Sequence, residues 1–349
     1  MSPGREPPGP VAGPHHDGAG GARRLRRGHR GGGNRELSMV PDAEFRSYYG
    51  RPVLKPPVWE WKIPAYLFTG GLAAGSAVLG AGADLTDRPA LRQAGRLGSL
   101  GALLVSVVLL VADLGRPERF HHMLRVAKPT SPMSVGTWIL TAFGPGVAVA
   151  AASELMPARW RRTRIGRLLG LLARPAGLSA VVFAPGVASY TAVLLSHTTA
   201  PGWFEARGQL PFVFSGSAAA SSGGLMMALA PVEEAGPARW FAASGAVGEL
   251  VASKVLESRL HPVILETYTT GRAHRLRAWS EGLTVAGLGG TLLAAHRSRT
   301  VAVASGIALL AGSALQRFGV FAAGVASTKD PRYVVVPQRE RLQERQPQT

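Results

Sequence analysis

The chain has 349 residues, of which 46% are hydrophobic and only 17% are charged, fewer charged residues than the roughly 25% of soluble domains. Its formal net charge is +18, and the arginines gather in the tails and in short connections between apolar segments, which favours contact with lipid head groups over nucleic acid. There is no cysteine, which excludes disulfides, thiolate metal sites and iron–sulfur clusters held by this protein's own thiolates.

The two ends of the sequence are polar. Residues 1–45 are rich in glycine, proline and arginine and poor in apolar residues, so they cannot bury enough surface to offset chain entropy and we expect a disordered basic tail. The same stretch lacks the short apolar core of a cleavable signal peptide. Residues 327–349 form a second polar tail, which leaves 46–326 as the folded domain.

Between the tails, apolar segments long enough to cross a membrane as helices recur along the sequence. They are crowded with Gly, Ala and Ser, which let helices approach closely in lipid. Pro185 lies inside the fourth segment and predicts a kink or a break there. We predict an all-α integral membrane protein with eight transmembrane helices, at residues 64–86, 97–115, 133–155, 175–196, 210–231, 238–257, 279–296 and 300–325.

Charge does not decide the orientation of these spans. Eight spans put both tails on one face, and the opposite face carries the densest short basic loop, "RWRRTRIGR" at residues 159–167. Counting the loops alone makes that opposite face cytoplasmic, whereas counting the tails as well reverses the sum.

A dense group of charged residues, "ADLGRPERFHHMLRVAKPTSPMSVGTW" (112–138), follows the second span. Asp113 lies in the last helical turn, where a carboxylate opposes the helix dipole and needs a partner. Arg116 and Arg119 are the nearest candidates in sequence. There are two interpretations of this stretch. It is either a helix cap with a cluster of ion pairs at the surface, or a site at which the Asp113 carboxylate exchanges protons at the entrance of a redox site.

Other ionisable residues lie within or beside the predicted spans. Glu249 and Lys254 are five residues apart in "GELVASKVLE", which is not the ideal helical spacing of three or four, so each could pair elsewhere. Arg317 is a possible partner for Glu249, either in a buried structural pair or on a proton path. His121 and His122 could admit protons, contact a partner or simply bond to backbone at the surface.

The charged stretch at 112–138 resembles the signature of the NrfD/PsrC family, the membrane subunits of polysulfide-reductase-type complexes. Three further stretches agree with it in order: "WEWKIPAYLFTGGLAAGSAVL" (59–79), "SYTAVLLSHTTAPGW" (189–203) and "RFGVFAAGVASTKDPRYVVVPQRERL" (317–342). Together the resemblance covers roughly residues 45–342 and implies two packed four-helix bundles.

The resemblance also implies a function. Members of this family bind a quinone, menaquinone or ubiquinone, and carry no haem or iron–sulfur cluster of their own. A ferredoxin-like iron–sulfur subunit docks on the membrane surface and connects the site to a catalytic subunit, often of the molybdopterin type. We therefore expect a multi-pass protein in the plasma membrane of a bacterium.

The resemblance assigns candidate site residues by position. A quinone head group needs hydrogen-bond donors for its carbonyl oxygens and a route for two protons. Some family members have a histidine and an amide where this sequence has Tyr66 and Ile63, and tyrosine does not titrate near neutral pH, so the proton donor differs here. The quinone-binding candidates are Tyr66, Asp113, Tyr190 and Thr191, with Asp113 and Tyr190 as catalytic candidates, and the proton-path candidates are Arg116, His121, His122, Glu249, Lys254 and Arg317.

Three functions therefore compete. The first is a subunit that exchanges electrons between the quinone pool and a peripheral iron–sulfur protein. The second is a transporter or channel, which the small-residue helices and buried charges favour, although the two halves show no convincing inverted repeat. The third is a purely structural membrane anchor, which the absence of the first-span histidine leaves open.

Overall fold

The computed structural model describes residues 53–345, and this part of the protein is built of helices and loops without a strand. The predicted disordered tail at 1–45 lies outside the described residues. Eight helices are long: α1 (Lys62–Leu85), α2 (Pro89–Ala112), α3 (Pro132–Leu155), α5 (Arg164–Ser196), α7 (Leu210–Leu229), α8 (Gly236–Arg259), α10 (Gly271–Leu293) and α11 (Arg299–Ser327). The shorter ones are η1 (Pro117–Leu124), α4 (Ala158–Arg161), α6 (Pro201–Glu205), η2 (Ala206–Gly208), α9 (Pro262–Thr269) and α12 (Arg332–Arg345).

Within the described residues, six helices are both long enough and apolar enough to cross a membrane, namely α1, α2, α3, α5, α7 and α11. α8 and α10 have the length, but charged residues such as Glu249 and Glu281 lower their hydropathy. The prediction of an all-α membrane protein is confirmed, whereas the assignment of α8 and α10 as further spans stays a prediction.

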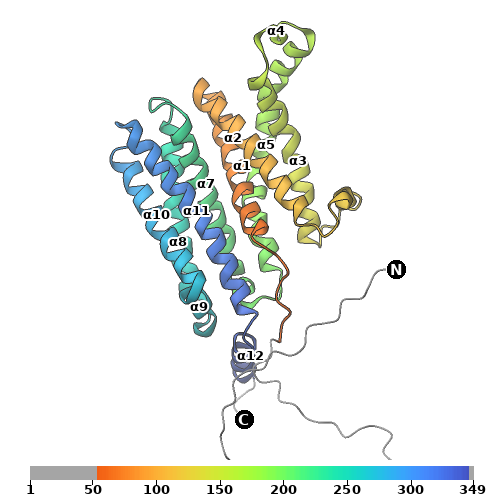
Figure 1. Cartoon of the computed structure of the whole chain (residues 1–349), viewed down its shortest axis with the longest axis vertical. Coiled ribbons are helices and arrows are strands. Elements are labelled where there is room, and N and C mark those ends of the chain that lie inside the picture. Colours follow the sequence, from red (N-terminus) through yellow and green to blue (C-terminus); the bar gives the residue numbers. More distant parts are fainter. Residues whose placement is uncertain (1–52, 346–349) are drawn as a thin grey trace, which may run out of the picture. The chain divides into compact units, whose positions relative to one another are not determined.

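The long helices contact one another in two sets of four (Figure 1). In the first set, α1 and α3 each pack against both α2 and α5. In the second set, α7 packs against α8 and α11, and α10 packs against the same two helices. Contacts of α1 with α7 and α11, and of α5 with α7, join the sets, so α1 lies at the centre of the packing.

Close approach between helices depends on glycine at two crossings. A Cβ atom on Gly95 of α2 would lie 2.5 Å from the Cα atom of Gly80 on α1. A Cβ atom on Gly306 of α11 would lie 2.3 Å from the carbonyl oxygen of Gly224 on α7. The small residues therefore act as expected for helix packing in lipid, because a larger side chain would force the backbones apart.

Several helices begin earlier than the apolar pattern predicted. α2 begins at Pro89 rather than 97, α5 at Arg164 rather than 175, and α10 at Gly271 rather than 279. Their first turns contain arginines, so the stretches are helical without being apolar. The predicted basic loop at 159–167 is instead α4 followed by the first turn of α5, where the Thr163 hydroxyl accepts a hydrogen bond from the Gly166 N–H at 3.1 Å.

Of the kink or break predicted at Pro185, the break is wrong, because α5 continues through this residue to Ser196, and the kink stays a prediction. A proline removes only one backbone hydrogen bond, and helix packing in a membrane bundle tolerates that loss. The polar tail also has structure: α12 contacts α9. His261 Nε2 lies 2.6 Å from a carboxylate oxygen of Glu340, and Arg332 pairs with Glu266.

Candidate functional site

Two tyrosines that were predicted from the sequence meet, although 124 residues separate them. Tyr66 lies in the second turn of α1 and Tyr190 near the end of α5, and their hydroxyl groups are hydrogen-bonded to each other. Tyr66 is fully buried and Tyr190 is partly buried. When one phenol donates to another, the second keeps its own proton. The pair can therefore still donate one hydrogen bond to a third group.

The surroundings of this tyrosine pair hold it in place. The ring of Tyr190 packs directly over Gly136 of α3, where a Cβ atom would come within 1.9 Å of a ring carbon. Both tyrosines border an apolar cluster that includes Leu67 and Leu195. Since hydrogen bonds are electrostatically stronger in such a low-dielectric setting, the pair forms a directed polar group in an apolar site.

Hydroxyl groups continue beside the pair. Thr191 is 1% exposed and its Oγ1 atom has no partner among the described residues. Buried side-chain oxygens without a partner are uncommon, which marks this position as one that a ligand or a water could complete. One helical turn after Tyr66, Thr69 Oγ1 lies 2.7 Å from Ser106 Oγ of α2. Sequence reasoning missed Thr69 and Ser106, although the spacing of three from Tyr66 was visible.

Asp113 directly follows α2, and neither of its two candidate partners pairs with it. Within the described part of the protein, neither Arg116 nor Arg119 lies within 4.0 Å of its carboxylate, because both are exposed around η1. Partial burial raises the pKa of Asp113, while Lys62 at the start of α1 lowers it and nearby Glu60 raises it. Asp113 therefore lies near the end of α1 that carries Tyr66 and holds its proton to a higher pH than an ordinary aspartate.

The structure leaves the other candidate residues of the charged stretch at the surface. Arg116, His121 and His122 are all exposed, and the two histidine rings pack edge to face with centroids 4.4 Å apart. The two histidines lie on η1 and Arg116 directly precedes it, beyond the end of α2. Their proposed roles in proton entry or partner contact stay predictions.

Glu249 and Arg317 are both deeply buried, in α8 and α11. Arg317 Nη2 donates to the carbonyl oxygen of Phe214 at 2.7 Å, and its guanidinium lies over the Phe214 ring at 3.7 Å from the centroid. The two charges do not come within 4.0 Å of each other in the structure of residues 53–345. Arg317 Nε and Nη1 and Glu249 Oε2 have no protein partner there, so the predicted pair is not a direct contact.

Lys254 does not belong with Glu249. Its side chain is 60% exposed and its ammonium group lies 3.1 Å from a carboxylate oxygen of Glu281 and 3.5 Å from one of Glu257. A residue five positions from Glu249 points to a different face of the helix, so the two do not meet. Lys254 therefore pairs elsewhere, as its spacing from Glu249 allowed, and its role on a proton path stays a prediction.

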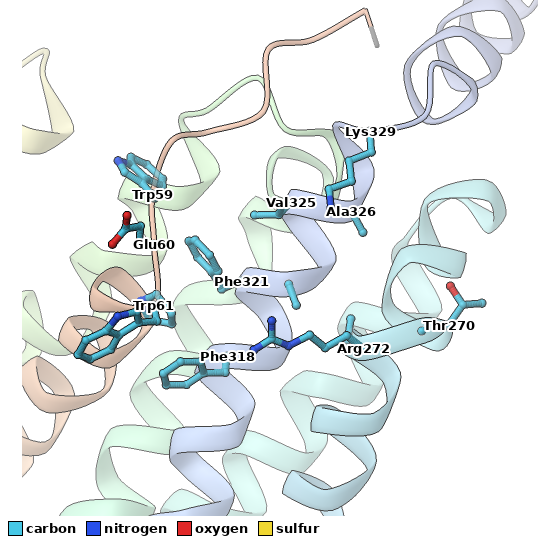
Figure 2. Close-up of a pocket in the computed structure, with 14 residues that line it drawn as sticks. Trp59, Glu60, Trp61, Thr270, Arg272, Phe318, Phe321, Val325, Ala326 and Lys329 are labelled. Carbon is cyan, nitrogen blue, oxygen red and sulfur yellow. The ribbon is translucent and has the colours of Figure 1, made fainter. Parts of the chain in front are cut away.

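A cavity of about 420 Å³ lies at the same end of the bundle as Tyr66. Figure 2 shows Arg272, at the start of α10, extending toward Phe318 of α11. Trp59 and Phe321 form an aromatic wall of this cavity and pack against Trp203 in the core. Their ring centroids lie 6.0 Å and 5.5 Å, respectively, from that of Trp203. The volume is in the range of small-molecule sites. Sequence reasoning missed this cavity, for which the tryptophans of "WEW" at 59–61 were the available signal.

Apolar helices of spanning length, packed through small residues, define an integral membrane protein, and polar side chains gather near one end of its bundle. The chain belongs to the polysulphide reductase NrfD family, whose sequence profile matches residues 53–237. The predicted family is thereby confirmed.

One relative gives a measure of the similarity. Over 186 residues the protein is 30% identical to the C subunit of polysulfide reductase from Wolinella succinogenes, and the match covers 49% of the present sequence. It spans 58% of the length of that relative. The stretch that matches the family profile contains Tyr66, Asp113 and Tyr190, whereas Glu249 and Arg317 lie outside it.

Proposed function

We propose that this protein is a membrane subunit of a bacterial reductase complex, in which it exchanges electrons between the quinone pool and a peripheral iron–sulfur subunit. The observation that carries the proposal is the meeting of the Tyr66 and Tyr190 hydroxyls at a buried site. Membership of the NrfD family supports it, as does the similarity to a polysulfide reductase subunit.

The residues near the tyrosine pair fit a quinone head group. The pair keeps one O–H proton for a carbonyl oxygen, and the Thr191 hydroxyl lacks a partner among the described residues. A bound quinone, menaquinone or ubiquinone, would supply two-electron chemistry that these side chains lack. Tyr66 and Tyr190 would orient its head, and Asp113 would exchange protons with the surface, for which a raised pKa suits it.

The aromatic cavity is a second candidate position for the ring. It has open volume, which favours it, and it shares the apolar cluster that includes Tyr66 through Trp59 and Phe321. Substitutions distinguish the two positions. A quinone beside the tyrosine pair should lose apparent affinity when Tyr66 or Tyr190 is changed, whereas a quinone in the aromatic cavity should lose it when Phe318 is changed.

The proposal includes the membrane arrangement. α8 and α10 would cross the membrane with the other six long helices, so that the two sets of four become two four-helix bundles in a multi-pass protein of the bacterial plasma membrane. The contact of Lys254 with Glu281 supports this, since opposite charges on α8 and α10 neutralise each other where single charges would be costly.

The proposed partners are a ferredoxin-like iron–sulfur subunit and, beyond it, a molybdopterin-type catalytic subunit. Exposed basic residues of η1 and its flanks, Arg116, Arg119 and Arg125, offer this partner a cationic surface beside Asp113.

Purification of the native complex tests the proposal. We expect the protein to copurify with a cluster-bearing partner, identified by mass spectrometry and by its electron paramagnetic resonance signal, and a quinol or quinone analogue to change that signal. A transporter or channel, which the buried charges of Glu249 and Arg317 favour, would instead purify without such a partner. That result would contradict the proposed electron transfer.

A further inference from the structure

The end of the bundle away from the tyrosine pair contains a cavity rich in arginine. Its volume is about 510 Å³, and it lies where the end of α1, the start of α2, the end of α3, α4 and the start of α5 come together. The arginines exceed the carboxylates in its lining by three. The charged residues that line it are Asp84, Arg92, Arg96, Glu154, Arg161, Arg167 and Arg174.

Both carboxylates are already engaged by the inner arginines. Arg96 is 8% exposed and joins the two acids, with Nη2 3.0 Å from Asp84 and Nη1 2.8 Å from Glu154. Arg92 Nε also lies 2.8 Å from Glu154. The Nε atom of buried Arg96 has no partner within the described residues.

The other three arginines of the lining, Arg161, Arg167 and Arg174, are not fully neutralised by carboxylates of the described residues. Arg174 lies 3.7 Å from Asp84, which Arg96 already holds more closely. No carboxylate comes within 4.0 Å of Arg161 or Arg167 in the structure of residues 53–345. The Nε atom of Arg161 donates to the carbonyl oxygen of Met156, at 3.2 Å. An anion in this cavity would therefore meet guanidinium groups that lack a counter-charge among the described residues.

Exposed apolar side chains lie on α4 and on the first turns of α5, two of the helices that also line the cavity. Ile165 is 72% exposed and Leu171 is 74% exposed, and Trp160 and Leu168 are exposed as well. Exposed apolar groups on the helices that line a basic site are suited to a molecule with an anionic head and hydrocarbon chains.

We propose that this arginine cavity binds the phosphate head group of an anionic glycerophospholipid. Guanidinium groups pair with phosphate oxygens in a two-pronged geometry, and basic pockets between membrane helices recognise such head groups. The bound lipid would connect α4 and α5, through Arg161 and Arg167, to the inner cluster on α1, α2 and α3. This site is independent of the tyrosine pair and of the proposed electron transfer.

Lipid retention tests the site. The full-length protein, purified in its native complex, is compared by native mass spectrometry and lipid extraction with the double variant Arg161→Gln and Arg167→Gln. The matched control is Arg159→Gln with Arg162→Gln, which removes the same charge from the same segment but outside the cavity lining. We expect at least a fivefold loss of retained phosphatidylglycerol in the cavity variant and none in the control. Equal retention in both variants would overturn the proposal.

A substitution that preserves charge guards against misfolding of the arginine variant. Gly170 lines the cavity and a Cβ atom there meets nothing within 4 Å, so Gly170→Trp fills the space and keeps every arginine. We expect the same loss of phosphatidylglycerol.

Inorganic phosphate distinguishes a lipid head group from a free anion as the ligand. The thermal midpoint should rise with phosphatidylglycerol in mixed micelles and stay unchanged in millimolar phosphate. A rise with phosphate alone would overturn the lipid assignment.

Discussion

The contribution of the Tyr190 hydroxyl to function can be tested without changing the packing of its ring. Tyr190→Phe removes one hydroxyl and keeps the ring over Gly136. We expect quinone-linked turnover of the native complex to fall about tenfold, because one hydrogen bond to a ligand is worth about 1 kcal/mol or somewhat more. Tyr333→Phe, on surface helix α12, is the control and should leave turnover unchanged. Normal turnover in Tyr190→Phe would remove Tyr190 from the site.

The substitution Asp113→Asn should lower turnover and raise stability at neutral pH. Asp113→Asn removes a proton-exchanging group, and we expect quinone-linked turnover to fall about a hundredfold, at the lower end for such groups. Subunit assembly, followed by gel filtration, should stay intact. Wild-type turnover in this variant would show that protons take another route.

The pH dependence of stability follows from the raised pKa of Asp113. Burial penalises the charged carboxylate in the folded protein, so the charged form costs stability at neutral pH, and asparagine avoids that cost. The thermal midpoint of Asp113→Asn should exceed that of the wild type at pH 7. The difference should shrink as the pH falls through the raised pKa and should be smallest below about pH 4. A constant difference would contradict this origin.

Buried Arg317 offers a stability test in the second set of helices. Arg317→Met removes the hydrogen bond to Phe214 and the stacking on its ring, and it also removes a buried cation from the part of the bundle that holds buried Glu249, so we expect a lower thermal midpoint. Adding Glu249→Gln should restore part of the loss in thermal midpoint. Equal midpoints for the single and double variants would show that Glu249 and Arg317 do not interact.

Sequence reasoning found some of these residues and misplaced others for identifiable reasons. Tyr66 and Tyr190 came from motif resemblance, yet no local pattern shows that residues 124 apart touch. The spacing of Lys254 from Glu249 indicated that it could pair elsewhere, but only the packing of α8 against α10 shows that its partner is Glu281. Asp113 does not pair with Arg116 or Arg119, although they are close in sequence, because both are exposed around η1.

Among the helices, the glycine crossing of α1 and α2 is the clearest packing test. Gly95→Ala places a methyl group 2.5 Å from Gly80, and we expect a loss of about 1–3 kcal/mol, read as a lower thermal midpoint. Gly101→Ala is the matched control in the same helix, since its Cβ meets nothing within 4 Å, and it should be neutral or slightly stabilising. Similar losses in both variants would point to a cause other than the crossing.

Helix boundaries were predictable where capping and apolarity agree. α3 begins within one residue of the predicted start, because Ser131 caps the helix and Pro132 occupies its first turn. The starts of α5 and α10 were missed, since turns rich in arginine are helical but do not resemble a membrane span. The basic segment at 159–167 was noticed as a topology signal, but only the folded protein shows that Arg161 and Arg167 border a cavity.

At the scale of the molecule, the lack of native cysteine makes the eight-span arrangement directly testable. Single cysteines introduced for Thr198 and Thr270 should react with a membrane-impermeant maleimide from one side, and those for Val232 and His296 from the other. This pattern follows if α7, α8, α10 and α11 all cross the membrane. Labelling of the positions at Val232, Thr270 and His296 from one side, opposite to Thr198, would rule out α8 and α10 as spans.

The central place of α1 has a consequence for how this protein tolerates change. In its most apolar stretch α1 has 78% of its residues buried, against 33% in α2 and α3, and it contacts helices of both sets. The outer helices can exchange one aliphatic side chain for another with lipid as the neighbour, but α1 has protein on nearly every side. A saturation mutagenesis library selected for assembly should therefore be depleted of α1 variants first. Homologues that drift apart in α2 and α3 should still keep side-chain volumes along α1 nearly constant.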